Sequence, residues 1–188
     1  MDAQILPVKA LSKRGHRRTR RHLFGAFLEA CRNQGAKTLI LTDGDERVLS
    51  YGDLRRAAFA LSSPLMSLTA KRETVGILLP TGAGAVIAML SIHAAGRVPA
   101  MLNFTAGVKN LKAAAETAQI TYVLTARKFV KIAGLETLIE DLSSSVKFLY
   151  LEDMKDALDT KAKLRAVLGP IFPKIFTPKP SPDEAGII

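Results

Sequence analysis

The stretch that decides the fold is residues 73–104, ETVGILLPTGAGAVIAMLSIHAAGRVPAMLNF. Its first part, residues 74–79, is a short apolar run with β-branched members, stopped by a proline and two glycines, as in a buried strand and its exit turn. Residues 85–95 are apolar on nearly every face, which predicts a helix covered on both sides. Residues 98–102 predict a second buried strand. The connection is too long for a hairpin, so the two strands should run parallel in a right-handed β-α-β unit.

The rest of the chain continues this alternation of helix and strand. Helices are predicted at residues 19–34, from a capping box at Ser50 and Asp53 onward, after a cap at Thr105 or Gly107, and at residues 135–142 and 156–168. Strands are predicted at residues 37–42, 47–49, 120–125 and 146–151, the first two as a hairpin. Pro64 should end or kink the second helix near Leu61. The pattern predicts an α/β fold, a mostly parallel, doubly wound sheet flanked by helices.

Length and composition limit the classes of protein that remain. The 188 residues, 48% of them hydrophobic, fit one domain with appendages. The single cysteine, Cys31, excludes an internal disulfide and a cysteine-rich metal site, and it favours a reducing compartment. It fits as a packed thiol on the apolar side of the first helix. No apolar segment precedes the N-terminal basic residues, so no signal peptide is recognisable.

Positive charge is concentrated at the N-terminus. Residues 1–22 hold seven Lys and Arg and one Asp, and so carry six of the ten net positive charges. Such an arm has three possible interpretations: it is a solvated linker, it contacts an anionic membrane surface, or it contacts nucleic acid. The last has least support, because no aromatic side chain is interleaved with the charges before Phe24.

The C-terminal region has a different composition. Residues 169–182 contain five prolines, which should not continue a helix or a central strand, so a linker is expected there. Residues 185–188, AGII, resemble the opening of a buried strand. The predicted division is a basic arm or interdomain linker at 1–18, an α/β subdomain at 19–168, and a Pro-rich linker with the start of a truncated strand at 169–188.

The loop Thr81-Gly82-Ala83-Gly84 follows a strand and precedes a helix, where its N–H groups could meet a phosphate. However, Ile87 stands where a dinucleotide fingerprint has its third glycine, and no Lys-Ser/Thr pair follows. A plain tight turn is therefore the better interpretation. A nicotinamide-dependent reductase would need a dinucleotide site at Gly82 and Gly84.

The three histidines do not indicate a catalytic or metal-binding site. His93 lies on the apolar helix and is expected to be packed and neutral, while His16 and His22 lie in the basic arm with no carboxylate or thiol spaced to complete a metal site. No Gly-x-Ser-x-Gly nucleophile elbow occurs. Residues 75–96 are uncharged and long enough to suggest a membrane span, but a proline and two glycines divide them into strand and helix.

Two motifs resemble landmarks of the adenylate-forming superfamily, which includes acyl-CoA synthetases, luciferases and peptide-synthetase adenylation domains. Residues 49–54, LSYGDL, resemble its Leu-Thr/Ser-Tyr-x-Glu-Leu motif. Residues 75–80 followed by 92–103 resemble its Leu-Pro strand end and Lys-Ala-Gly-x-x-x-x-Pro-Leu-Asn segment. Asp53 in place of glutamate, and His93-Ala94 in place of Lys-Ala, depart from the family pattern.

Two longer segments are more specific. Residues 97–107, RVPAMLNFTAG, and 117–129, TAQITYVLTARKF, most resemble the bifunctional acyl-acyl carrier protein synthetase/2-acylglycerophosphoethanolamine acyltransferase branch. The whole resemblance covers roughly residues 19–188. It implies a bacterial cytoplasmic enzyme at the inner membrane that salvages phospholipid acyl chains, with an acyltransferase domain before the synthetase.

The resemblance also implies the chemistry of the full-length enzyme. ATP and Mg²⁺ would activate a fatty acid as an acyl-adenylate, and the acyl group would pass to the thiol of acyl carrier protein or CoA. The family's phosphate loop follows a strand that would begin at residues 185–188, so no catalytic, cofactor-binding or metal residue is assigned to this chain. We expect a non-catalytic N-terminal portion, inactive alone. The alternative is a free-standing α/β binding module whose basic arm contacts a membrane surface or nucleic acid, with a steep salt dependence.

Overall fold

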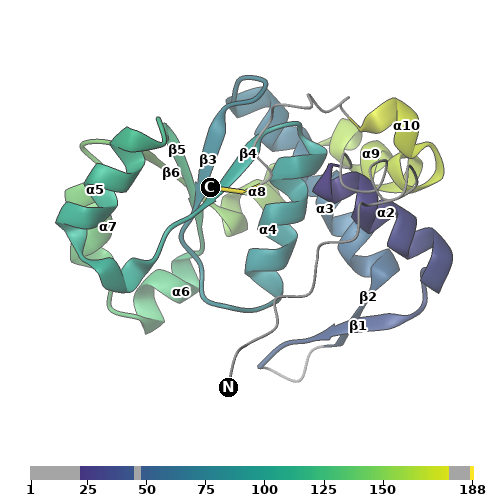
Figure 1. Cartoon of the computed structure of the whole chain (residues 1–188), viewed down its shortest axis with the longest axis horizontal. Helices are drawn as coiled ribbons and strands as arrows, with labels where there is room; N and C mark the ends of the chain where they lie inside the picture. Colours follow the sequence, from purple (N-terminus) through teal and green to yellow (C-terminus); the bar gives the residue numbers. More distant parts are fainter. Residues whose placement is uncertain (1–21, 45–47, 178–186) are drawn as a thin grey trace, which may run out of the picture.

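The computed structural model describes residues 22–44, 48–177 and 187–188. Its centre is a four-stranded sheet in the order β4-β3-β5-β6 (Figure 1). The strands are β3 (Thr74–Ile77), β4 (Val98–Met101), β5 (Tyr122–Thr125) and β6 (Lys147–Tyr150). All neighbours are parallel, so the predicted α/β fold with a parallel sheet is confirmed.

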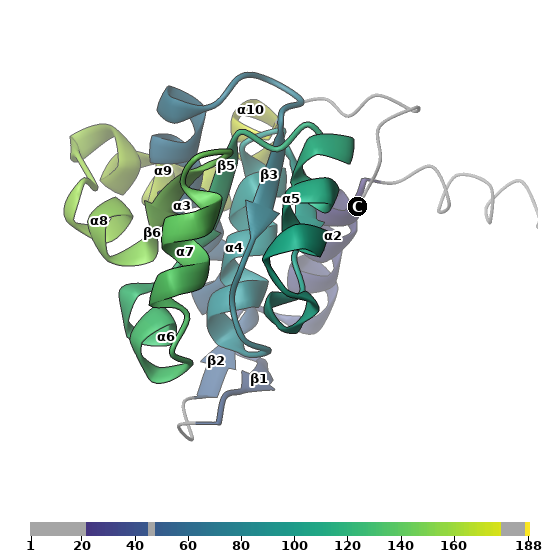
Figure 2. The same ribbon diagram turned by 90° about the vertical axis from the view of Figure 1, so that its left-hand side faces the viewer.

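Helices cover both faces of this sheet (Figure 2). α3 (Tyr51–Leu68) and α4 (Ala83–Ala94) lie on one face, and α5 (Val108–Thr117) and α7 (Glu136–Leu142) lie on the other. Two apolar cores result: one includes Leu65, Ile77 and Ile92, and the other includes Leu111, Val123 and Leu142. As predicted, α4 has buried residues around most of its circumference, and Gly107 caps α5.

α2 (Leu23–Gln34) and a hairpin form a third layer beside α3 and α4. The hairpin pairs β1 (Leu39–Thr42) with β2 (Val48–Ser50) in antiparallel register, as predicted. Phe24 of α2 is fully buried and meets Phe59 of α3 edge to face, with ring centroids 5.4 Å apart. Cys31 is also buried, and this burial raises the pKa of its thiol. The prediction of a packed thiol is confirmed.

The predicted capping box starts α3. The Asp53 N–H donates to Ser50 Oγ at 3.2 Å, and the Ser50 N–H donates to Asp53 Oδ2 at 2.9 Å. Of the two outcomes predicted for Pro64, an end or a kink of this helix, the end is wrong, because α3 continues to Leu68 with Pro64 inside it; the kink stays a prediction. Packing of α3 against α4 and α9 offsets the lost backbone hydrogen bond.

The C-terminal region is more helical than its prolines suggested. α6 (Arg127–Ile132), which the sequence analysis did not predict, follows β5, and α8 (Leu151–Asp156) follows β6. α9 (Thr160–Ile171) begins at its N-cap Asp159, later than the helix predicted at 156–168, and α10 (Pro173–Phe176) comes next.

The prediction that residue 169 onward leaves the helix is therefore wrong for Gly169–Phe176, because α9 crosses that position with Pro170 inside it. A Cβ added at Gly169 would lie 2.6 Å from the Phe59 ring, so the helix backbone packs directly on the core. The division into subdomain and linker stays a prediction.

Ile188 pairs with the edge strand β4. Its N–H donates to the Pro99 carbonyl at 3.0 Å, and the Met101 N–H donates to its carbonyl at 2.9 Å, which is the parallel pattern. Ile187 and Ile188 are 45% and 54% exposed, so Ile188 pairs as a strand residue does, but the burial predicted for this segment is absent at these two residues. The basic arm with His16, and residues 178–186, lie outside the described residues.

Within the described ranges, no helix combines the length and the apolar character needed to cross a membrane. Residues 75–96, the candidate span, are divided into β3, a loop and the twelve-residue α4.

Candidate functional site

A cavity of about 430 Å³ opens at the carboxyl ends of β3 and β5. The chain leaves β3 toward β4 on one side and later returns to β5 on the other, so this is the point where the strand order reverses. Ligands of open α/β sheets bind outside the carboxyl ends of the strands at such a point. The cavity is therefore the candidate site.

Most of the cavity wall is apolar. It comes from the β3 exit loop, from α6 and from α8, and it includes Leu79, Pro80, Phe129, Ile132, Ala133 and Leu151. Two ionisable side chains, Asp43 of the hairpin and Lys128 of α6, also line it. Such a wall suits an apolar ligand with few polar groups.

The predicted loop Thr81–Gly84 lies in this wall, but its surroundings do not favour a phosphate. A Cβ at Gly82, the N-cap of α4, would lie 2.6 Å from Asp43 Oδ1. The Asp43 carboxylate thus occupies the space beside the loop, and a phosphate there would meet its negative charge. The tight-turn interpretation is supported over a phosphate or dinucleotide cradle.

Hydrogen bonds between α6 and α8 hold the α6 side of the cavity in place. The Glu152 carboxylate accepts the backbone N–H groups of Arg127 at 3.1 Å and Lys128 at 3.3 Å, at the start of α6. Burial opposes ionisation of Glu152, but these hydrogen bonds and the Arg127 charge hold its pKa below the ordinary value. Arg127 also pairs with Asp153, at 2.7 Å between Nη2 and Oδ2, and lies over the Tyr150 ring.

Sequence reasoning missed this cluster. The available signal was that Arg127 directly follows one parallel strand and Glu152-Asp153 follows the next, because carboxyl ends of neighbouring parallel strands lie at one edge of the sheet.

Arg97, in one of the two longer segments that carry the resemblance, has a structural position. It is 6% exposed and donates to Thr69 Oγ1 at 2.8 Å and to the carbonyls of Met66, Thr69 and Ala95. Burial lowers the pKa of its guanidinium. Arg97 therefore binds the carbonyl ends of α3 and α4 rather than lining the cavity.

His93 is 2% exposed, as expected for a packed histidine, and its ring meets that of His22 with centroids 5.2 Å apart. His22 was predicted to belong to the basic arm, but it lies against α4 at the start of α2. No group of three His, Cys, Asp or Glu side chains within the described ranges is placed to hold a metal ion.

Neither the start of α4 nor the start of α6, both beside the candidate cavity, fits the phosphates of ATP. The Thr81–Gly84 loop at the start of α4 has the Asp43 carboxylate beside it. The start of α6 is already occupied by the Glu152 carboxylate.

A comparison with known protein families matches residues 27–187 to the AMP-binding enzymes. This chain belongs to the AMP-binding enzyme family. The superfamily expected from the motifs is thus confirmed, whereas closeness to the acyl-acyl carrier protein synthetase/acyltransferase branch stays a prediction.

Solved structures share the fold of this family member. VinN in complex with 3-methylaspartate has a TM-score of 0.67 at 15% identity, over 89% of this chain and 44% of VinN. The o-succinylbenzoate CoA synthetase MenE from Bacillus subtilis, bound to the acyl-adenylate intermediate OSB-AMP, has a TM-score of 0.60 at 19% identity, over 71% of this chain and 33% of MenE. The nonribosomal peptide synthetase FmoA3, bound to α-methyl-L-serine-AMP, has a TM-score of 0.59 at 20% identity, over 74% of this chain and 15% of FmoA3.

This family member spans less than half the length of each of those three structures. At such identities the similarity establishes the fold of this chain and not its substrate.

Proposed function

We propose that this chain is the N-terminal part of an ATP-dependent synthetase that converts a fatty acid to an acyl-adenylate and then transfers the acyl group to the thiol of acyl carrier protein or CoA. The observation that carries the proposal is the match of residues 27–187 to the AMP-binding family on a parallel α/β fold. MenE, which shares that fold, is solved with an acyl-adenylate.

Two features support a fatty acid as the substrate. The segments 97–107 and 117–129, which carry the resemblance to the acyl-acyl carrier protein synthetase branch, contact each other through Phe104 and Phe129, whose ring centroids are 5.1 Å apart. Phe129 also lines the candidate cavity, whose wall is mainly apolar. Burial of an alkyl chain against such a wall lowers the free energy of the bound state.

The reactive groups for adenylation are assigned to the remainder of such an enzyme. In this proposal the phosphate loop and the catalytic lysine belong to that remainder, so the 188-residue chain alone is expected to be inactive. As part of this proposal the enzyme salvages phospholipid acyl chains at the inner face of a bacterial membrane, and the basic arm at residues 1–22 contacts anionic lipid. Nucleic acid is the less favoured partner of that arm.

Pyrophosphate exchange with ATP tests the proposal. A synthetase that contains these residues and the remainder of the enzyme should show pyrophosphate exchange that long-chain fatty acids stimulate. It should then transfer the acyl group to acyl carrier protein or CoA. Exchange stimulated only by amino acids or aromatic acids would reject the fatty acid. Fatty-acid-dependent exchange from the 188 residues alone would reject the assignment of the chemistry to the remainder.

A non-catalytic binding module is the second candidate, favoured by the net charge of +10. It predicts binding to nucleic acid or another polyanion that weakens steeply with salt. Titration of this chain with single- and double-stranded nucleic acid at several salt concentrations separates the two, because the synthetase fragment should bind only weakly through its arm.

A further inference from the structure

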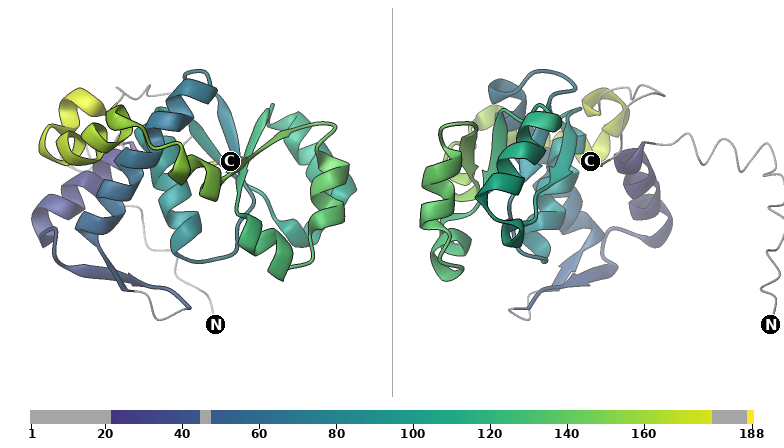
Figure 3. Two further views of the ribbon diagram at one scale, coloured as in Figure 1. Left: turned by 180° about the vertical axis from the view of Figure 1, so that it is seen from behind. Right: turned by 60° about the vertical axis from the view of Figure 1, so that its left-hand side comes forward.

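α9 and α10 lie at one end of the molecule (Figure 3). These two helices carry an exposed apolar surface. Five large side chains make up this surface and are at least half exposed: Leu164 54%, Val167 60%, Ile171 61%, Phe172 50% and Ile175 76%. Along α9 the first three have the spacing of one helix face. The opposite side of α9 is buried, because Ala162 and Gly169 pack on α3 and its Phe59.

The charged side chains within α9 and α10 are all basic, and the acidic Asp159 caps the start of α9. Residues 160–177 contain Lys161, Lys163, Arg165 and Lys174 and no Asp or Glu. Protein interfaces are depleted of lysine at their centres, whereas segments that lie in a bilayer surface combine apolar side chains with flanking Lys and Arg. Charge complementarity therefore favours an anionic lipid surface over a protein partner.

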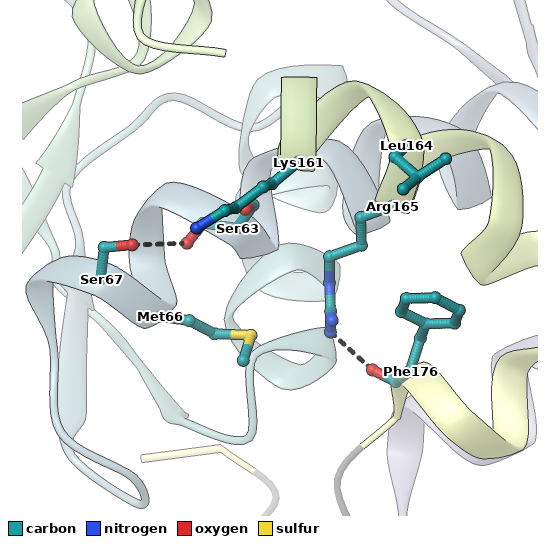
Figure 4. A pocket seen from close by; sticks show the side chains of 7 residues that line it. All are labelled: Ser63, Met66, Ser67, Lys161, Leu164, Arg165 and Phe176. Atoms are coloured by element: carbon teal, nitrogen blue, oxygen red, sulfur yellow. Dashed lines mark hydrogen bonds between the residues drawn. The ribbon is translucent and has the colours of Figure 1, made fainter. Parts of the chain in front are cut away.

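A pocket of about 450 Å³ lies between α3 and this apolar surface (Figure 4). Lys161, Arg165 and the hydroxyl-bearing Ser63 and Ser67 line it, with Met66, Leu164 and Phe176 as apolar neighbours. Arg165 is fixed there: its Nε donates to Ser62 Oγ at 2.7 Å, and its Nη2 donates to the carbonyls of Ala94 at 3.2 Å and Phe176 at 2.5 Å, so these donors are already used within the protein. The pocket thus places the Lys161 ammonium and the positive charge of the internally hydrogen-bonded Arg165 next to apolar side chains, which suits an anionic lipid headgroup with its acyl chains.

We propose that the α9–α10 surface docks on an anionic lipid bilayer, with Leu164, Val167, Ile171, Phe172 and Ile175 entering the interface and the Lys161–Arg165 pocket receiving an anionic headgroup. This contact is separate from the basic arm. It does not depend on the substrate proposed above, because its test measures lipid contact alone.

The chain has no tryptophan, so a single introduced tryptophan reports on its own position. The variant Ile175→Trp in the full chain should show blue-shifted emission, and quenching by brominated lipid, with vesicles of phosphatidylglycerol and phosphatidylcholine but not with phosphatidylcholine alone. Leu39→Trp, at a site 67% exposed on the hairpin, is the control and should show neither.

Paired substitutions in the Ile175→Trp background separate apolar and charge contributions. Val167→Glu with Ile171→Glu should abolish the lipid-dependent emission shift, whereas Leu39→Glu with Ile40→Glu should not. Lys161→Ala with Lys163→Ala should weaken vesicle binding about 25-fold, since each lysine near an anionic surface contributes roughly fivefold. Lys109→Ala with Lys112→Ala on α5 removes the same charge elsewhere and should have a much smaller effect.

Vesicle binding of the Ile175→Trp variant without an emission shift would assign lipid contact to the arm alone and overturn the proposal. A shift that needs no lipid and rises with protein concentration would assign this surface to a second copy of the chain. An introduced tryptophan that is already buried in a longer synthetase would assign the surface to the remainder of that enzyme. Either of these last two results also rejects bilayer docking.

Discussion

The backbone of Gly169 packs directly against the ring of Phe59, so closely that an added Cβ would lie 2.6 Å from its Cδ1 and Cγ atoms. This contact joins the C-terminal α9 to α3, and Phe59 is fully buried at the join. A region whose prolines suggested a linker is therefore part of the core.

Gly169→Ala should destabilise the protein by about 1–3 kcal/mol, because the rigid Phe59 ring must shift out of a packed core to admit the methyl group. Urea denaturation measures the loss. Gly25→Ala is the matched control: Gly25 is also helical, but nothing lies within 4 Å of its added Cβ. Its substitution should be neutral or stabilising. Equal losses in both variants would contradict the packing role of Gly169.

Arg97→Met should cost about 2–3 kcal/mol or more, because it leaves buried carbonyls at the ends of α3 and α4 without donors. Arg97→Lys should recover only part of this, since an ammonium lacks the planar fork that reaches several carbonyls. Chemical denaturation tests both, with the exposed Lys71→Met as control. Normal stability of Arg97→Met would show that this hydrogen-bond network contributes nothing.

Gly82→Ala should destabilise the chain by about 1 kcal/mol in the presence of Asp43 and by less in its absence, because the added methyl group meets the Asp43 carboxylate. A double-mutant cycle with Asp43→Ala measures this coupling through unfolding free energies. If the two effects simply add, the carboxylate does not occupy the space beside the glycine loop. The argument against a phosphate there would then fail.

The capping box of α3 should give the stability a pH dependence. Hydrogen bonds from the Ser50 hydroxyl and the Ser50 backbone hold the pKa of Asp53 below its ordinary value. Because the pKa is lower in the folded state, the stabilisation is complete above pH about 4 and is lost as the pH falls through the lower folded value.

Asp53→Asn should therefore cost about 0.5–1 kcal/mol at neutral pH, with the difference from wild type shrinking in acid. Thermal unfolding from neutral to acidic pH follows this difference. Glu140→Gln, on the exposed side of α7, removes one negative charge without a cap and is the control. A difference that stays constant through acid would show that Asp53 ionisation does not support the cap.

Ile132→Asp tests the candidate cavity in an active synthetase. Ile132 lines the cavity and is 73% exposed, so the change should leave folding intact. The introduced carboxylate should raise KM for long-chain fatty acids more than for short ones, because it faces the alkyl chain. Leu39→Asp on the hairpin is the control. An unchanged KM across chain lengths would place the acyl group elsewhere.

Much of the fold could be predicted from local pattern. The apolar runs around Val75 and Ala100, separated by an interval that only a helix could fill, determined a parallel β-α-β unit, because strand direction follows from connection length. Ser50 and Asp53 determined where α3 begins, because a capping box needs only residues three apart. The motifs also determined the superfamily, since their residues are contiguous in the chain.

Tertiary structure alone decided where the helices end and what surrounds the candidate site. Pro64 and Pro170 remain inside helices because packing between α3, α4 and α9 outweighs the free-energy cost of a proline within a helix. The sequence shows the prolines, but it does not show the packing that compensates for them. The approach of Asp43 to Gly82, and of Glu152 to Arg127, joins residues far apart in the chain. Such contacts depend on the folded positions of whole elements, so no local pattern could specify them.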